Sequence, residues 1–392
     1  MNHQSIISEL KGFATKPELL SSAEYKKYRS YLDKLLTTPQ IFAATNAQPI
    51  LDDFIRLAHW NIEKGKHLDA VINAFLTHPI LQSADIISIN EADVGMNRSS
   101  QAHVAQALGE ALNMHVAFAP CYLEFSKGYG DDLLMEGENT TALQGNSILS
   151  RYPILNPRVI ELPLCYDHFE HVEKRIGNRN ALMAEFEIKG KHLAVVSTHL
   201  EVRNAPSCRA KQIAAIVREL EKPEAPASAI IAGDFNSNTF ARGGMLTTMQ
   251  GFLRLMFSDA DRLRQSIKAP QSREPLFALL KKHGFSEAGF NSQDVSCYVP
   301  MTILEDSAAL PGFLTKAINR QMARYNGQLD FRLDWMLGRN VIALRDQEII
   351  DAKTKIASLK PHTISGLRNK DGSQVADHDP ITVDLKNLKF TQ

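Results

Sequence analysis

Residues 228–235 read SAIIAGDF, a short apolar run that ends at an acidic side chain. Three further runs have a similar form: FIRLAHW at 54–60, DIISIN at 85–90 and HLAVVSTHL at 192–200. Short apolar runs bounded by polar segments are typical of strands that are buried on both faces of a sheet. Such strands need other elements to cover them, so these runs predict a layered α/β protein.

Helical patterns lie between these runs. HLDAVINAFL (67–76), QAHVAQALGEALN (101–113) and APSCRAKQIAAIVREL (205–220) each repeat apolar residues at helical spacing, and Pro206 suits the first turn of the last one. Near the N-terminus, AEYKKYRSYLDKLL (23–36) follows a serine that can cap it. We therefore expect helices and strands to alternate, after an N-terminal helical extension over residues 1–50.

The tract from about 240 to 324 interrupts this alternation. It contains two helical patterns, GMLTTMQGFLRLM (244–256) and EPLFALLKKHGF (274–285), among loop-like Pro, Ser and Gln residues. We interpret the tract as an insertion beside a functional site. Its FLRLM segment is explained better by a packed amphipathic helix than by lipid binding.

Composition narrows the class of protein. The 392 residues include 44 Lys and Arg and 44 Asp and Glu, and 7% are aromatic. Extended nucleic-acid grooves combine basic stripes with aromatic platforms, so these figures disfavour one. The four cysteines are scattered, which predicts free thiols. The sequence shows no basic segment followed by an apolar run at its start and no apolar window of membrane-spanning length, so we expect a soluble, cytoplasmic protein.

Acidic, amide and imidazole side chains follow the predicted strands. Each alone has a simpler explanation, because Asp and Asn commonly form turns and a single His is usually structural. Independent turns would rarely all select side chains of this chemistry, so we expect these residues to gather at one edge of the sheet. They are Asn61, Glu63, Glu91, His199, Asp234, Asn236, Asp334, Asp377 and His378.

Seven segments in order resemble the motifs of the endonuclease/exonuclease/phosphatase superfamily. The resemblance extends from about Arg56 to Leu385, and it implies a deoxyribonuclease-I-like, four-layered α/β sandwich with two packed mixed sheets between helices. It also implies that residues 51–392 form a catalytic domain for metal-dependent cleavage of phosphoesters. The segments are HWNIEKG (59–65), DIISINEAD (85–93), QGNSILSRYPI (144–154), VVSTHL (195–200), IIAGDFNS (230–237), FRLDWM (331–336) and VADHDPI (375–381).

A phosphodiester resists attack by water because it is anionic, so a catalyst must neutralise its charge. Mg²⁺, or Mn²⁺ in its place, does so while bound by carboxylate oxygens. We predict Glu91 as the main metal ligand, and the resemblance implies that Glu63 and Asp377 support it. Asn61 would hold the Glu91 carboxylate or a metal-bound water.

The attacking water needs a proton acceptor and a partner that orients it. Asp234 and Asn236, two apart on an extended segment, point to the same face and fit these roles. By resemblance, Asp334 orients His378, which stabilises the scissile phosphate or shares in general-base catalysis. His199 matches a histidine of deoxyribonuclease-I and sphingomyelinase relatives, which binds phosphate or protonates the leaving oxygen, and this favours functions other than abasic-site repair.

Three residues are candidates for binding substrate phosphate: Asn146, Arg179 and Arg209. Each arginine alone is more often an ordinary surface residue. Three functions stay open at this point: a phosphodiesterase for compact substrates, a nuclease acting on DNA or RNA, and an inactive protein that binds phosphorylated ligands. The intact acidic, amide and imidazole positions weigh against the third function.

Overall fold

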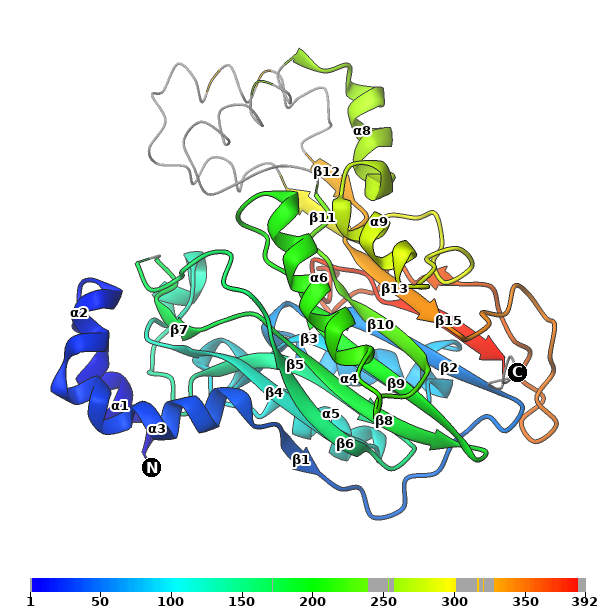
Figure 1. The fold of residues 1–392 in the computed structure, drawn as a ribbon, viewed down its shortest axis with the longest axis horizontal. Helices are drawn as coiled ribbons and strands as arrows, with labels where there is room; N and C mark the ends of the chain where they lie inside the picture. The colour runs from blue at the N-terminus through cyan, green and yellow to red at the C-terminus, as the bar shows by residue number, and fades with distance from the viewer. Residues whose placement is uncertain are drawn as a thin grey trace.

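Two β-sheets face each other at the centre of the computed structural model, and helices cover the outer face of each (Figure 1). The structure describes residues 2–170, 172–238, 257–300 and 328–386, with residues 253, 316 and 320. The fold is a mixed α/β sandwich of four layers. The fold class predicted from the sequence is therefore confirmed.

The larger sheet has eight strands in the order β1-β4-β5-β3-β2-β15-β14, with β7 paired to β4. The smaller sheet has five strands in the order β13-β10-β9-β8-β6, and β11 (Cys297–Pro300) pairs with β12 (Gln328–Phe331) in a separate ribbon. The larger sheet consists of β1 (Gln40–Phe42), β2 (Phe54–Asn61), β3 (Ile86–Val94), β4 (His115–Glu124), β5 (Leu143–Ser150), β7 (Arg175–Gly177), β14 (His362–Thr363) and β15 (Ile381–Lys386). The smaller sheet consists of β6 (Leu155–Glu161), β8 (Asn180–Ile188), β9 (Lys191–His199), β10 (Ser228–Asp234) and β13 (Asp334–Arg339).

The apolar runs are strands buried on both faces. In β2, Ile55 and Leu57 pack between the two sheets, whereas Ala58 and Trp60 belong to the core under the outer helices. Successive side chains of a strand point to opposite faces, so a strand between two cores is apolar at nearly every position. This explains why these runs lack polar alternation.

The helices divide between the two outer faces. Over the larger sheet lie α4 (Leu68–Thr77) and α5 (Val104–Leu112). The N-terminal helices α1 (His3–Leu10), α2 (Lys16–Ser21) and α3 (Ala23–Thr37) pack against the same core from beside β4 (Figure 1). The smaller sheet is covered by α6 (Pro206–Leu220) and α9 (Pro275–Lys282). As expected, the Ser22 hydroxyl caps α3 by accepting a hydrogen bond from the Tyr25 N–H group. Strand β1 also comes from the first 50 residues and pairs with β4.

The predicted insertion is described only in part. Most of its first helical pattern, 244–256, which includes the FLRLM segment, lies outside the described residues. The second pattern forms α9, which follows α8 (Ala260–Lys268). Leu276, Phe277 and Leu280 of α9 are buried in the same core as α6. This part of the tract therefore belongs to the outer helical layer.

The prediction of four free thiols is wrong for two cysteines. Cys165 and Cys208 form a disulfide, whereas Cys121 and Cys297 are free and buried. The residues are 43 positions apart, so sequence spacing gave no sign that the fold brings them together. The expectation of a cytoplasmic protein thereby loses the support that unpaired thiols gave it. Among the described residues, no helix has the length and apolar character needed to cross a membrane.

Candidate active site

Strand pairing brings the predicted residues to one edge of the two sheets. In the smaller sheet, Asp234 lies opposite His199 of the parallel strand β9 and opposite Asp334 of the antiparallel strand β13. A Cβ atom on Gly233 would lie 1.8 Å from the Thr198 carbonyl oxygen, so only glycine permits this close approach of β9 and β10. The fold therefore makes Asp234 a direct neighbour of both residues.

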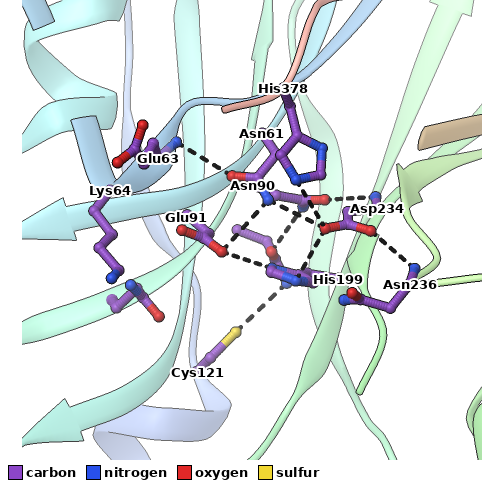
Figure 2. Close-up of polar contacts among 12 residues, drawn as sticks. Asn61, Glu63, Lys64, Asn90, Glu91, Cys121, His199, Asp234, Asn236 and His378 are labelled. Carbon is purple, nitrogen blue, oxygen red and sulfur yellow. Dashed lines mark hydrogen bonds and ion pairs between the residues drawn. The ribbon is translucent and has the colours of Figure 1, made fainter. Parts of the chain in front are cut away.

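Asn61 joins the larger sheet to the smaller one. Its Nδ2 atom donates to Asp234 Oδ2 at 3.2 Å and lies 3.4 Å from Glu91 Oε1 (Figure 2). Its Oδ1 atom accepts from the Glu63 N–H group at 3.2 Å. One buried amide thus links three carboxylate-bearing residues, two of them on different sheets.

Three of the predicted site residues have a backbone conformation that side chains rarely adopt. The φ angles of Glu63, Glu91 and Asn236 are 48°, 60° and 47°. Glu91 lies where the register between β3 and β5 shifts, at a bulge that redirects its side chain. Such conformations commonly occur at functional sites, where the surrounding fold holds them in place.

Glu63, Glu91 and Asp377 form an acidic group beside Asn61. The Asp377 N–H group donates to Glu63 Oε2 at 3.2 Å. Burial, together with the charges of Asp377 and Glu91, raises the pKa of Glu63, and Lys66 at 3.7 Å offsets this only in part. Mutually repelling carboxylates supply the oxygen ligands that a hard divalent cation prefers, so these residues fit such an ion.

A second acidic group lies on the other side of Asn61. Asp234, Asp334 and His378 each present a possible ligand atom, within 4.8 Å of one another. However, Asp334 Oδ1 accepts from His59 at 3.1 Å, and Asp334 Oδ2 accepts from Ser296 at 2.6 Å and His378 at 2.7 Å. Both oxygens of Asp334 already accept hydrogen bonds. Asp334 is therefore better placed to orient His378 than to bind a cation.

The pair formed by His378 and Asp334 is buried and charged. Burial alone would lower the pKa of His378, but Asp334 raises it well above its usual value. Burial alone would raise the pKa of Asp334, but His378 and His59 hold it well below its usual range. The backbone is also fixed here, since Trp60 Nε1 donates to the His378 carbonyl at 2.8 Å. Asp334 therefore favours the imidazolium form of His378, whose Nε2 lies 3.8 Å from Asp234 Oδ2.

His199 has the opposite charge preference. Its Nε2 lies 3.3 Å from Asp234 Oδ2, and its Nδ1 lies 3.8 Å from Glu91 Oε1 (Figure 2). Burial and the nearby cations Arg179 and His378 lower its pKa well below the usual value. Burial also raises the pKa of Asp234 to about 7. The surroundings therefore shift the pKa values of His199 and His378 in opposite directions, although both rings lie beside the same carboxyl group of Asp234.

Asn236 differs from the arrangement expected for it. The chain beyond Asp234 does not stay extended, because Asn236 adopts a positive φ. Its N–H group donates to Asp234 Oδ1 at 2.8 Å, and its Nδ2 donates to the Leu200 carbonyl at 2.9 Å. The Asn236 side chain therefore holds the segment that follows His199.

The candidate phosphate-binding residues separate into different environments. Arg179 is 7% exposed and has no hydrogen bond among the described residues, with Glu201 at 3.9 Å as an ion-pair partner. Arg209 is fully buried, and Glu274 takes hydrogen bonds from its Nε and Nη2 at 3.1 and 2.6 Å. This buried ion pair gives the Arg209 guanidinium a structural partner, and the predicted contact of Arg209 with substrate stays a prediction.

Asn146 lies in the polar layer between the sheets. Its Nδ2 donates to the Asn180 carbonyl at 3.0 Å, and its Oδ1 accepts from Asn90 at 2.8 Å. Asn90 in turn accepts from the Asp234 N–H group at 2.9 Å. A direct phosphate contact would require Asn146 to give up one of these bonds, so its observed role is to connect β5 to the site.

The family model of the Endonuclease/Exonuclease/phosphatase family matches residues 58–350. The chain belongs to this family. Members are generally hydrolases of phosphoester bonds that use divalent metals, and the resemblance seen in the sequence motifs is confirmed. No curated protein matches the chain.

Several solved structures are similar to this member of the family. An endonuclease/exonuclease/phosphatase from Beutenbergia cavernae is 14% identical, and the match covers 85% of this chain and 72% of the Beutenbergia protein with a TM-score of 0.44. A humanized D. rerio TDP2 is 14% identical, and the match covers 85% of this chain and 99% of TDP2 with a TM-score of 0.45. The human Nocturnin catalytic domain with bound sulfate is 14% identical, and the match covers 89% of this chain and 97% of the Nocturnin domain with a TM-score of 0.45.

The sequence interpretation missed two residues of this family member's site. His59 lies in the quoted run FIRLAHW and faces the same side of β2 as Asn61, so strand periodicity offered a signal. Ser296 lies in the tract interpreted as an insertion, where no pattern marked it. Both bind Asp334, and Ser296 Oγ also accepts from the Asp334 N–H group at 3.1 Å.

Proposed function

We propose that this protein is a divalent-metal-dependent phosphodiesterase that directs a water molecule at phosphorus, in line with the leaving oxygen. One observation carries the proposal: the Asn61 amide contacts both Glu91 and Asp234. A carboxylate that can bind a metal ion therefore lies next to a carboxylate that can accept a proton from water. The Nε2 atoms of His199 and His378 lie 3.3 and 3.8 Å from the same oxygen of Asp234, Oδ2. Phosphodiester hydrolysis needs such neighbouring groups.

Glu91, Glu63 and Asp377, with Asn61, would hold the cation, and Mg²⁺ suits their oxygen ligands, with Mn²⁺ as an alternative. When bound, this ion would neutralise negative charge on the phosphoryl group. Asp234 would accept the proton of the attacking water. Its position between two histidines and an amide supports this role.

Two cationic groups would stabilise the anionic transition state. His378 is the imidazolium held by Asp334, and its charge would interact with the phosphoryl oxygens. Arg179 is a buried guanidinium without a hydrogen bond among the described residues. Burying a cation without hydrogen-bond acceptors is costly, and an anionic ligand such as phosphate would supply them. We assign Arg179 to the substrate phosphate.

The proposal is tested by an activity panel with Mg²⁺, Mn²⁺ and a chelator. The substrates are a chromogenic phosphodiester, plasmid and single-stranded DNA, RNA, sphingomyelin and phosphoinositides. We expect metal-dependent hydrolysis of a non-polymeric phosphodiester that the chelator abolishes. Hydrolysis that persists in the chelator would reject the metal requirement, and preferential cleavage of DNA or RNA at moderate salt would show a nuclease instead.

A further inference from the structure

Asp334 is bound by histidines from two different parts of the chain. His378 Nδ1 lies 2.7 Å from Oδ2, and His59 Nε2 lies 3.1 Å from Oδ1. The side chains of His59 and Asp334 are both 0% exposed. An ionised carboxylate can only accept hydrogen bonds, so each histidine nitrogen that faces it is a donor.

The two oxygens of Asp334 are not supported equally. Oδ2 accepts from both Ser296 and His378, whereas His59 is the single side chain that donates to Oδ1 within the described part of the chain. A buried carboxylate oxygen without a partner is costly, and the terminal torsion of Asp has broad, weakly defined wells. Without His59, the carboxylate would rotate toward other donors.

The ring of His59 is itself held in place. Its Nδ1 lies 3.0 Å from Ser88 Oγ, and Ser88 Oγ lies 2.8 Å from Ser197 Oγ on the smaller sheet. A hydrogen-bonded chain therefore runs from Ser197 through Ser88 and His59 to Asp334. Both nitrogens of His59 have partners, which fixes the ring plane and the direction of Nε2.

We infer that His59 is a positioning residue that orients the Asp334 carboxylate, and through it the His378 imidazole ring, toward the reacting phosphoryl group. The inference rests on the proposed function only for the last step, in which His378 meets the substrate. His59 is separated from that substrate by Asp334. Its removal should alter His378 without removing any group that contacts the phosphoester.

A purely structural role is the competing explanation, because His59 also fills space between the sheets. His59→Leu removes both nitrogens and keeps an apolar side chain of similar size. His59→Gln retains an N–H donor near the position of Nε2. His103→Leu is a matched control, since His103 is a half-buried histidine that caps α5 and whose partners, Gln40 and the Gln106 N–H group, are not site residues.

The first measurement needs no substrate. The low-field proton resonance of His378 Nδ1–H is identified by its loss in His378→Ala, and is then recorded in each variant. We expect it to shift or broaden in His59→Leu, and to stay near its original position in His59→Gln and His103→Leu. An unchanged resonance in His59→Leu would overturn the positioning role, whatever the protein hydrolyses.

The second measurement uses turnover of the phosphodiester. His59→Leu should lower kcat by about 10- to 100-fold with little change in KM, and His59→Gln should recover most of the loss. In a His378→Ala background, His59→Leu should have no further effect, because it acts through His378. An equal loss in both backgrounds would show a structural role. Absence of turnover in the unmodified protein would reject the proposed function, while the resonance would still decide the role of His59.

Discussion

The Nδ1 atom of His378 lies 2.7 Å from the Oδ2 atom of Asp334, and this ion pair is nearly excluded from water, with side chains 6% and 0% exposed. Burying two charges is costly unless each is well paired. Here Ser296 and His59 supply further donors to the carboxylate. Asp334 in this pair raises the pKa of His378 well above its usual value, so a change at Asp334 should alter His378 directly.

Asp334→Asn should lower kcat while leaving metal affinity unchanged. An amide carries no charge to hold the His378 imidazolium, so we expect a loss of about 10²- to 10⁴-fold. Steady-state kinetics on a chromogenic phosphodiester and calorimetric titration with Mg²⁺ would measure the two effects separately. A comparable loss of Mg²⁺ affinity would indicate that Asp334 is a metal ligand, in the group it forms with Asp234 and His378.

Glu91→Ala should abolish metal-dependent turnover and leave the fold intact. It removes one of three mutually repelling carboxylates, so the free energy of unfolding without metal should stay the same or rise. The unmodified protein should gain thermal stability as Mg²⁺ is added, because a ligand of the folded state stabilises it. Thermal unfolding with and without Mg²⁺ measures both effects.

Glu187→Ala is the control for this variant, since Glu187 is an exposed residue of β8. It should retain both turnover and the stabilisation by Mg²⁺. If Glu91→Ala keeps full activity, or if Mg²⁺ stabilises it as strongly as the unmodified protein, the acidic group is not the metal site.

The fold and most of the candidate site could be predicted because their signals are local. Runs such as SAIIAGDF carry the pattern of a strand buried on both faces, and the polar residue that ends each run marks the edge of the sheet. Asp234 could be grouped with His199 on this basis. Their direct pairing follows from the β9–β10 register, which the structure supplies.

Other features depend on contacts between distant segments. Arg179 and Arg209 are equally plausible phosphate-binding residues in the sequence, yet Glu274, 65 positions away, encloses Arg209 in an ion pair. Ser296 reaches Asp334 from a tract with no recognisable motif. A single sequence contains the residues but not the pairing, so such assignments need the structure.

Arg179→Ala and Arg209→Ala should therefore fail in different ways. Arg179→Ala removes a buried cation that has no hydrogen bond among the described residues, so it should lower kcat/KM by about 10²-fold. It should cost less stability than Arg209→Ala, because its ion pair with Glu201 is longer, at 3.9 Å. Arg209→Ala removes a fully buried guanidinium from its ion pair with Glu274 and should cost about 3–5 kcal/mol of stability. Kinetics and urea unfolding of both variants would measure this contrast. If Arg209→Ala loses kcat/KM while its stability is unchanged, Arg209 binds substrate after all.

The disulfide between Cys165 and Cys208 should be detectable in the purified protein. Burial raises the pKa of the two free thiols, to about 11 for Cys121 and about 12 for Cys297, so neither should react with a thiol reagent until the protein unfolds. In denaturant without a reductant, two thiols should then react, and four should react after reduction. Four reactive thiols in unreduced protein would contradict the disulfide.

The same bond should contribute to stability. It joins the segment before β7 to the first turns of α6 across 43 residues, and a loop of this length predicts a stabilisation of roughly 4 kcal/mol. A reductant should therefore lower the unfolding temperature of the unmodified protein. It should have no effect on the Cys165→Ser/Cys208→Ser double variant, because that variant has no bond to reduce. If the reductant destabilises both proteins equally, its effect has another cause and the bond does not stabilise this fold.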